Sequence, residues 1–283
     1  DEIRSRGLGD VYKRQATSLN YYMKIATWNI NSIRLRKENV INFLKKENID
    51  ILCLQETKTI DEQFPITFFN NYGYVHVYFR GEKSYNGVAI LSKIPFKNTS
   101  FQNFCNLNDT RHIKIELYNN ITIHNFYVPA GGDVADIKSN PKFKHKLQFM
   151  EEMIKFLKNE KFKNRIILGD FNIAPFENDV WSHKSLLNVV SHTKAETNYF
   201  SKLLKFGAFE DIIRNNFKQD DKIYSWWSYR NKDWKKSNRG RRLDHILISK
   251  NIQKYIQSVK IYKSIRDEKK PSDHVPISIT LKF

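Results

Sequence analysis

The stretch Arg165-Ile166-Ile167-Leu168-Gly169-Asp170-Phe171-Asn172 places an apolar run directly before a glycine and two polar residues. Such a run predicts a β-strand that is buried on both faces. Gly169 permits a tight turn or a close approach of backbone. If the backbone stays extended, Asp170 and Asn172 project to the same side of the strand end, whereas an Asx-type turn is the alternative. Either way, we expect both side chains where functional residues of α/β folds gather.

This strand belongs to a strand–helix–strand unit, and a similar unit lies earlier in the chain. The predicted ranges are 24–28, 33–44 and 50–54 in the first unit, and 121–127, 143–157 and 165–168 in the second. The second helix is predicted from the spacing of Phe143, Leu147, Met150, Ile154 and Leu157. Each unit ends at a carboxylate, Glu56 in one and Asp170 in the other. The pattern predicts a structural duplication.

The rest of the chain adds further strands and one helix without a linker rich in Pro, Gly or Ser. The strands are expected near 75–79, 88–91, 113–117, 243–248, 258–262 and 277–281, and the helix near 196–205. We therefore predict one α/β domain over residues 23–283, an α/β sandwich of two packed sheets with outer helices. Residues 1–22 show no periodicity, and we expect a non-native or disordered extension there, with Met23 opening the first strand.

Composition sets broad limits on the class of protein. The 283 residues are 40% hydrophobic and 14% aromatic, which suffices for a sizeable core. The net charge of +18 suits a polyanionic partner such as nucleic acid, although solvated surface lysines explain it equally well. No apolar run approaches the roughly 20 residues of a membrane span. With two cysteines and no visible secretory leader, we expect a reduced intracellular, cytoplasmic protein and no disulfide.

Three more polar strand ends carry candidate chemistry. Glu56 follows an apolar strand and must find water, a cation or a hydrogen bond, and the alternative to a metal is a salt bridge with Lys58. His274 precedes the last strand, and Asp244 is the best candidate for a carboxylate that keeps its ring charged. A surface histidine beside a capping aspartate is the alternative. The Tyr127 hydroxyl can donate to a phosphate, or the ring can simply fill the core.

Taken together, the order and spacing of these strand ends resemble the exonuclease III family of abasic-site endonucleases, within the endonuclease/exonuclease/phosphatase superfamily. The resemblance runs from about Met23 to Phe283. The most specific segments are 28–31 (WNIN), 54–58 (LQETK), 169–175 (GDFNIAP), 224–230 (YSWWSYR), 242–244 (RLD) and 272–276 (SDHVP). This resemblance implies a DNase I-like, four-layer α/β sandwich with two mixed β-sheets.

The resemblance also implies roles for individual residues. Glu56 is the principal metal ligand, Asp170 prepares the attacking water, and His274 contacts the scissile phosphate. The implied metal-binding residues are Asn29, Glu56, Asp170, Asn172, Asp273 and His274. The implied catalytic residues are Tyr127, Asp170, Asn172, Asp244 and His274. Carboxylate and amide oxygen ligands suit Mg²⁺, with Mn²⁺ as a substitute. Zinc is less expected, because the sequence has no compact His/Cys cluster.

A basic and aromatic segment between Trp226 and Arg242 provides a candidate DNA interface, or else a solvated loop with packed aromatics. We expect DNA contacts from Asn31, Arg111, Trp226, Trp227 and Arg241, with Trp226 near a deoxyribose pocket whose apolar wall would favour a base-free sugar. Ala130 stands where the family usually has a polar residue after Tyr-Val-Pro. A phosphate contact is therefore missing there, or a backbone amide of Gly131-Gly132 replaces it.

The predicted function is a Mg²⁺-dependent DNA-repair phosphodiesterase that cuts duplex DNA 5′ to abasic sites, with 3′-5′ exonuclease and 3′-end-cleaning activity. We expect it to act as a monomer. Two alternatives remain: another nuclease or phosphatase of the superfamily, and a DNA-binding homologue without catalysis. Every expected catalytic position holds a competent residue type, which argues against the second alternative.

Overall fold

The computed structural model describes residues 21–283. The predicted extension 1–22 therefore lies outside the described residues except for Tyr21 and Tyr22. Tyr22 already belongs to the first strand, and the backbone of Tyr21 pairs with Phe283, with N···O distances of 3.2 and 2.9 Å. The first strand thus begins one residue before Met23.

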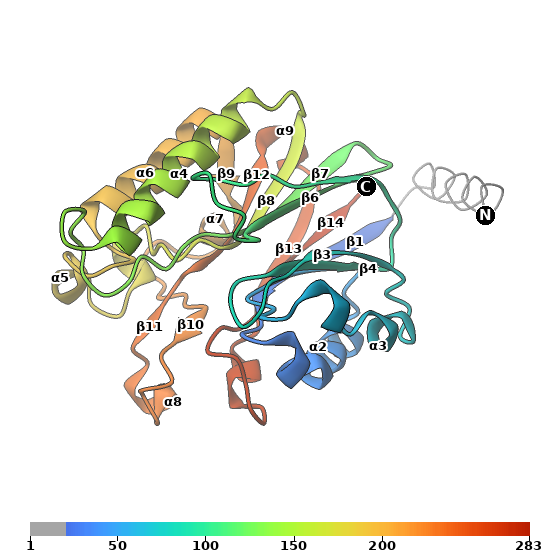
Figure 1. The fold of residues 1–283 in the computed structure, drawn as a ribbon, viewed down its shortest axis with the longest axis horizontal. Helices are drawn as coiled ribbons and strands as arrows, with labels where there is room; N and C mark the ends of the chain where they lie inside the picture. Colours follow the sequence, from blue (N-terminus) through green and yellow to red (C-terminus); the bar gives the residue numbers. More distant parts are fainter. Residues whose placement is uncertain (1–20) are drawn as a thin grey trace.

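Two six-stranded mixed sheets form the centre of the molecule (Figure 1). The first contains, in spatial order, β13 (Ile256–Ile261), β14 (Ile277–Lys282), β1 (Tyr22–Asn29), β2 (Ile51–Gln55), β4 (Val88–Ser92) and β3 (His76–Arg80). The second contains β5 (Phe96–Ser100), β6 (His112–Leu117), β7 (Ile121–Tyr127), β8 (Asn164–Asp170), β12 (Asp244–Ser249) and β9 (Phe209–Asp211). All the predicted strands are present, and β5 and β9 are strands that the sequence pattern did not predict.

The two sheets repeat one pairing pattern. In each, the central pair is parallel, β1 with β2 and β7 with β8, and all other neighbours are antiparallel. A helix joins the strands of each parallel pair, as such a crossover requires. The predicted duplication is therefore visible in the topology.

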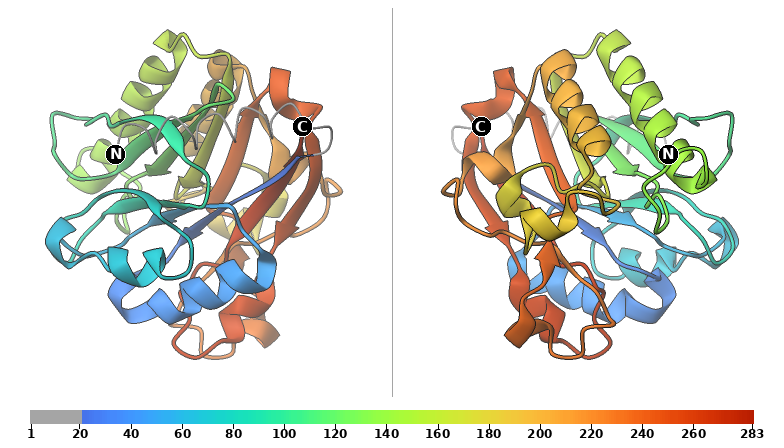
Figure 2. Two further views of the ribbon diagram at one scale, coloured as in Figure 1. Left: turned by 90° about the vertical axis from the view of Figure 1, so that its right-hand side faces the viewer. Right: turned by 90° about the vertical axis from the view of Figure 1, so that its left-hand side faces the viewer.

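Helices cover the outer face of each sheet, which gives four layers (Figure 1, Figure 2). The first sheet carries α2 (Ile33–Glu47) and α3 (Ile66–Asn70), and the second carries α4 (Pro141–Asn159) and α6 (Lys194–Gly207). Shorter helices are α5 (His183–Leu186), α7 (Ile212–Asn215), α8 (Trp234–Ser237) and α9 (Lys250–Gln253). The predicted four-layer α/β sandwich is confirmed.

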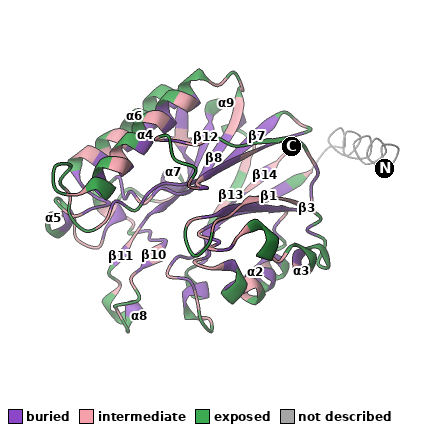
Figure 3. Ribbon diagram, in the orientation of Figure 1, coloured by how far each residue is buried: buried purple, intermediate pink, exposed green. Residues whose placement is uncertain are grey.

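Three apolar clusters hold the layers together. One lies between the sheets and includes Ile25 and Ile166, a second joins the first sheet to α2, and a third joins the second sheet to α4 and α6. Figure 3 shows the buried strands inside and the exposed outer faces of the helices. Along the described residues, no helix combines the length and the apolar character needed to span a membrane.

The pairing pattern brings the polar strand ends to one edge of the sandwich. Parallel strands in a pair finish at the same edge, and the antiparallel strands β12 and β14 begin there. Gly169 allows this convergence, because its φ is +137° and a Cβ would lie 1.9 Å from the Phe126 carbonyl oxygen. Only a glycine fits that close approach of two backbones. A hairpin of β10 (Trp226–Trp227) and β11 (Gly240–Arg241) projects from the same edge.

Candidate active site

Asn29 connects the two sheets at this edge. It is the last residue of β1 and is fully buried. Its Nδ2 donates to Glu56 Oε1 at 2.8 Å and to Asp170 Oδ2 at 2.9 Å. Asn29 thus joins the carboxylates that follow β2 and end β8, which belong to different sheets.

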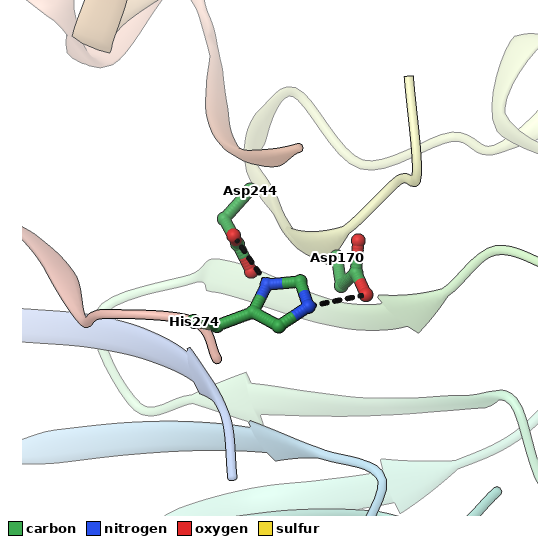
Figure 4. A group of neighbouring side chains, drawn as sticks. All are labelled: Asp170, Asp244 and His274. Carbon is green, nitrogen blue, oxygen red and sulfur yellow. Dashed lines mark hydrogen bonds and ion pairs between the residues drawn. The ribbon is translucent and has the colours of Figure 1, made fainter. Parts of the chain in front are cut away.

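His274 lies between two buried carboxylates (Figure 4). Its Nδ1 is 2.8 Å from Asp244 Oδ2, and its Nε2 is 3.7 Å from Asp170 Oδ2. Asp244 opens β12 directly opposite Asp170 in the antiparallel register, which places both carboxylates beside the ring. The predicted pairing of Asp244 with His274 is therefore present.

The charges of this group follow from its surroundings. Burial raises the pKa of Asp170 to about 7; the nearby Asp244 adds to this effect, while His274 opposes it. Burial by itself would lower the pKa of His274, but Asp244 and Asp170 raise it to about 10. In this arrangement the two carboxylates favour the imidazolium form of the ring. The ligand atoms of Asp170, Asp244 and His274 lie within 4.8 Å of one another, close enough to hold a metal ion, and the predicted metal-ligand role of His274 stays a prediction.

Asn172 departs from the predicted extended backbone. Its φ is 52°, and its N–H donates to Asp170 Oδ1 at 2.9 Å, which is the Asx-type turn considered as the alternative. The turn still brings the side chains together, since Asn172 Nδ2 donates to Asp170 Oδ2 at 3.2 Å and to the Val128 carbonyl oxygen at 2.9 Å. Asp170 Oδ2 is therefore the point where Asn29, Asn172 and His274 meet.

Glu56 takes part in both arrangements weighed for it. Its Oε2 forms an ion pair with Lys58 Nζ at 2.8 Å, and Lys58 Nζ also donates to Asn31 Oδ1 at 2.7 Å. Burial works to raise the pKa of Glu56, but Lys58, Asn29 and His274 together lower it. Glu56 and Asn31 thus already hold one positive charge between their oxygens. Glu56 and Lys58 both adopt a φ of 51°, a left-handed conformation that concentrates at functional sites.

Tyr127 ends β7 and points into the same group. Its hydroxyl donates to Glu56 Oε1 at 2.8 Å. Burial, Glu56 and Asp170 raise the pKa of Tyr127 well above its ordinary value, so the phenol keeps its proton. It can donate a hydrogen bond but has no tendency to ionise.

Asp273 and Asn31 link this group to the β10–β11 hairpin. Asp273 accepts hydrogen bonds from Asn31 Nδ2 at 3.1 Å and from Trp226 Nε1 at 2.9 Å. Trp226 also pairs with His274 through an isolated antiparallel bridge. Asp273 lies outside the carboxylate pair around His274 and orients the Trp226 indole.

A cavity of about 520 Å³ opens next to Trp226. Its lining residues are Trp181, Trp226, Ser228, Arg230, Asn231, Ser237, Arg239 and Arg241. The Arg241 guanidinium lies 5.4 Å from the Trp226 ring and the Arg239 guanidinium 4.8 Å from the Trp181 ring. Cations and aromatic faces thus alternate beside the catalytic edge.

Of two further predicted DNA contacts, Trp227 is buried, and the contact by Arg111 stays a prediction. Trp227 is only 1% exposed and packs against Tyr224 and Trp234, so it supports the hairpin from inside and offers no surface to DNA. Arg111 is half-buried; it forms an ion pair with Asp109 at 2.5 Å and lies over the Tyr127 ring. Its charge is already partnered, next to the site.

Some supporting residues escaped the sequence analysis. Gln55 Nε2 donates to Asn125 Oδ1 at 2.7 Å, and Asn125 Nδ2 donates to the carbonyl oxygens of Leu54 and Ala89, so buried amides tie the two sheets together behind Glu56. Both residues stand inside apolar strands, which is the signal that was available. Lys146 is another such residue, on the buried face of α4.

Comparison with known proteins agrees with this geometry. The sequence model of the endonuclease/exonuclease/phosphatase family matches residues 26–274. The chain belongs to this family. Exodeoxyribonuclease III of Haemophilus influenzae is 32% identical over 272 residues, which cover 90% of this chain and 98% of that protein.

Solved structures of the endonuclease/exonuclease/phosphatase family show the same fold. An AP endonuclease from Archaeoglobus fulgidus has a TM-score of 0.84 and 34% identity, with 92% of this chain and 99% of that chain covered. The 3′ phosphatase NExo from Neisseria, bound to product DNA hairpin, has a TM-score of 0.85 and 30% identity, with 92% and 100% covered. The predicted exonuclease III-type fold and enzyme class, a phosphodiester hydrolase, are confirmed.

Proposed function

We propose that this chain is a Mg²⁺-dependent DNA-repair nuclease that cuts duplex DNA 5′ to abasic sites and trims 3′ ends. One observation carries the proposal. The buried Asp170 carboxylate, whose pKa is raised, contacts the His274 ring and the amides of Asn29 and Asn172, and this group lies beside a cavity lined by arginine and tryptophan. Relatives named exodeoxyribonuclease III and AP endonuclease support the reaction class. We further propose that it acts as a monomer in the cytoplasm.

The residues around Glu56 fit a hard divalent cation. Oxygen atoms of Glu56 and Asn31 already contact the Lys58 ammonium group, so these oxygens can bind a positive charge. Glu56 and the amide oxygen of Asn31, which both contact Lys58 Nζ, would hold Mg²⁺, which prefers oxygen ligands. The other predicted ligands, Asn29, Asp170, Asn172, Asp273 and His274, stay predictions. When bound, the ion would draw negative charge from the phosphoryl oxygens. The donors include no thiolate, which favours Mg²⁺ or Mn²⁺ over zinc.

The chain's own residues then divide the remaining work. Asp170, whose pKa is about 7, can accept a proton from water at neutral pH. Asn172 Nδ2 lies within 3.2 Å of the same carboxylate and orients that water. The His274 imidazolium supplies positive charge toward the phosphate, with Asp244 keeping it protonated. The Tyr127 hydroxyl is a hydrogen-bond donor toward the phosphate or the leaving oxygen.

The cationic cavity favours activity at 3′ ends as well. Arg230, Arg239 and Arg241 line it, and among the described lining residues none is acidic. Trp181 and Trp226 also line the cavity, so the predicted apolar wall that would select a base-free sugar lies beside these arginines and stays a prediction. Guanidinium groups there favour a sugar that carries a further phosphate, since arginine binds phosphate through paired hydrogen bonds.

A set of matched substrates tests this function. The values of kcat/KM would be measured with Mg²⁺ on a duplex with one abasic analogue, the same duplex intact, a duplex with a 3′-phosphate, and an inositol phosphate. We expect cleavage of the first and third, slow trimming of the second, and no turnover of the inositol phosphate. Preferred turnover of the inositol phosphate would overturn the proposal in favour of a phosphatase for small molecules.

A further inference from the structure

Lys146 is a fully buried lysine on α4, behind the catalytic edge. Its Nζ donates to the Asn172 carbonyl oxygen at 2.7 Å and to the Ala130 carbonyl oxygen at 3.2 Å. It also forms an ion pair with Glu196 Oε1 at 2.5 Å. One ammonium group therefore contacts both segments that follow β7 and β8. Tyr127 is the last residue of β7, and Asp170 is the last residue of β8.

Glu196 is equally buried and fixes the other side of this ion pair. Its carboxylate accepts hydrogen bonds from the backbone of Ser191 at 2.9 Å and of Thr193 at 3.1 Å, and from Thr193 Oγ1 at 2.7 Å. Thr193 and Glu196 form the capping box that starts α6. The Ser191 hydroxyl in turn accepts from Arg241 at 2.7 Å. The Lys146–Glu196 ion pair thus joins the Asn172 turn to the segment that holds Arg241.

Backbone packing leaves the lysine little freedom. Gly131 has a φ of +92°, and a Cβ there would lie 2.8 Å from Lys146 Cδ and 3.0 Å from Val190 Cγ1. The loop after β7 therefore packs directly on the lysine stem. Burial lowers the pKa of Lys146 while Glu196 opposes this. Lys146 Nζ has three oxygen partners, the Ala130 and Asn172 carbonyl oxygens and the Glu196 carboxylate.

The contact with Asn172 has a consequence for the site. The direction of the Asn172 carbonyl oxygen depends on the ψ angle of that residue. Its φ of 52° is in the left-handed region. In this turn the side chain of Asn172 reaches Asp170 Oδ2 and the Val128 carbonyl oxygen. A donor on the carbonyl oxygen therefore holds the amide group in place beside Asp170.

We propose that Lys146, through its paired contacts with the Asn172 and Ala130 carbonyl oxygens, is a positioning residue that fixes Asn172 against Asp170. The alternative is that the Lys146–Glu196 ion pair only stabilises the packing of α4 against α6. The proposal rests on the proposed function, in which Asn172 orients the water. It extends that function by naming a buried residue that sets the geometry without touching substrate.

The double variant Lys146→Met/Glu196→Gln tests the proposal without leaving an unpaired buried charge. The amide oxygen that Glu196→Gln introduces still caps α6, so the fold is retained, and only the ammonium contacts disappear. Because small misplacements of a catalytic group are costly, we expect kcat on the abasic duplex to fall by about 10- to 100-fold with KM within about threefold. The melting temperature should change little. Wild-type kcat in the double variant would overturn the proposal.

Two controls separate positioning from general stability. Lys144→Met removes an exposed lysine of the same helix, and we expect wild-type kcat. Glu196→Gln alone leaves Lys146 beside the carbonyl oxygens but without its carboxylate, so the melting temperature should fall, while kcat of the folded protein should stay within about threefold of wild type if the carbonyl contact is what matters. An equal loss of kcat in Glu196→Gln and the double variant would show that the ion pair, and not the carbonyl contact, is responsible.

A readout without catalysis keeps the inference distinct from the proposed function. The side-chain amide signal of Asn172, assigned with Asn172→Asp, can be followed by ¹H–¹⁵N NMR in the protein without DNA. We expect it to shift or broaden in the double variant and to stay in place in Lys144→Met. If the wild type cleaves none of the DNA substrates, the proposed function fails while this signal still tests the positioning. An unmoved signal in the double variant contradicts the positioning even if the enzyme is active.

Discussion

The Asp244 carboxylate holds the His274 ring through a buried contact of 2.8 Å between Oδ2 and Nδ1. The other ring nitrogen faces Asp170 at 3.7 Å. Burial disfavours the charged ring, and the two carboxylates outweigh it, so the pKa of His274 is about 10. Asp244 therefore favours the charged form of His274, the cation that we propose faces the phosphate.

Removing the charge of Asp244 should move the alkaline limit of activity. In Asp244→Asn, the pKa of His274 falls because its main stabilising charge is gone. We expect kcat/KM at pH 8 to drop by about 10²- to 10⁴-fold, in the range of lost general acid–base or charge assistance. We expect wild-type activity to decline near pH 10, and in the variant this decline should begin at a lower pH. A pH–rate profile from about pH 5 to about pH 10 measures this, and an unchanged alkaline limb would show that His274 does not act as the cation.

The ionised Asp170 carboxylate should lower the free energy of unfolding, although the proposed reaction needs it. Its pKa is raised from 3.8 to about 7, so the unfolded chain ionises this group more readily, and its contribution to stability decreases as the pH rises from about 4 to 7. Asp170→Asn should therefore be inactive yet melt several degrees higher than wild type at about pH 8, since about 1 kcal/mol corresponds to roughly 2–4 °C at this chain length.

The pH dependence of this gain provides its control. The difference in melting temperature should shrink below about pH 4, where Asp170 is protonated in both states. The exposed Asp220→Asn should show no gain at either pH. Destabilisation of Asp170→Asn at alkaline pH would contradict the raised pKa.

Substitutions of the two tryptophans of β10 should affect different properties, DNA affinity for Trp226 and stability for Trp227. Trp226 lines the cavity, so Trp226→Ala should weaken binding of abasic duplex with a small change in melting temperature. Trp227 is 1% exposed, and Trp227→Ala should lose about 3–5 kcal/mol of unfolding free energy, as expected for a buried aromatic residue. Fluorescence-anisotropy titration and urea unfolding of both variants test this contrast. A loss of DNA affinity only in a fully folded Trp227→Ala would reverse the assignment.

Glu56 should determine the metal requirement. Glu56→Gln keeps the shape of the side chain but removes a charge that the proposed Mg²⁺ site needs. We expect activity to be sharply lower at limiting Mg²⁺ and partly restored at high Mg²⁺. Titrating activity against Mg²⁺ for wild type and variant measures this shift. Full activity of the variant at low Mg²⁺ would mean that Glu56 is not the ligand.

Much of the fold followed from the sequence because burial leaves a clear pattern. The apolar runs that end at Glu56 and Asp170 predicted two buried parallel strands, and both are central strands of their sheets. The strand β5 was missed because most of its residues are exposed, so it lacks an apolar face. The strand β9 has only three residues and offers too short a pattern.

Among the contacts of the site, the sequence predicted the pairing of Asp244 with His274 but not most of the others. Trp226 and Trp227 are adjacent, and sequence alone does not show which one faces the cavity. Lys146 stands three residues after Phe143 and four before Met150, so it shares their buried face, yet a charged residue there contradicts the simple apolar pattern. The state of His274 depends on carboxylates distant in the chain, and only the fold brings those together.

Product analysis of a single-turnover reaction tests the central claim most directly. A duplex with one abasic analogue, labelled on the damaged strand, would be mixed with excess protein, with Mg²⁺ and then with a chelator. We predict one cut on the 5′ side of the analogue, leaving a 3′-hydroxyl, and its loss on chelation and in Asp170→Asn. Binding without incision, or a cut that persists with chelator, would contradict the account.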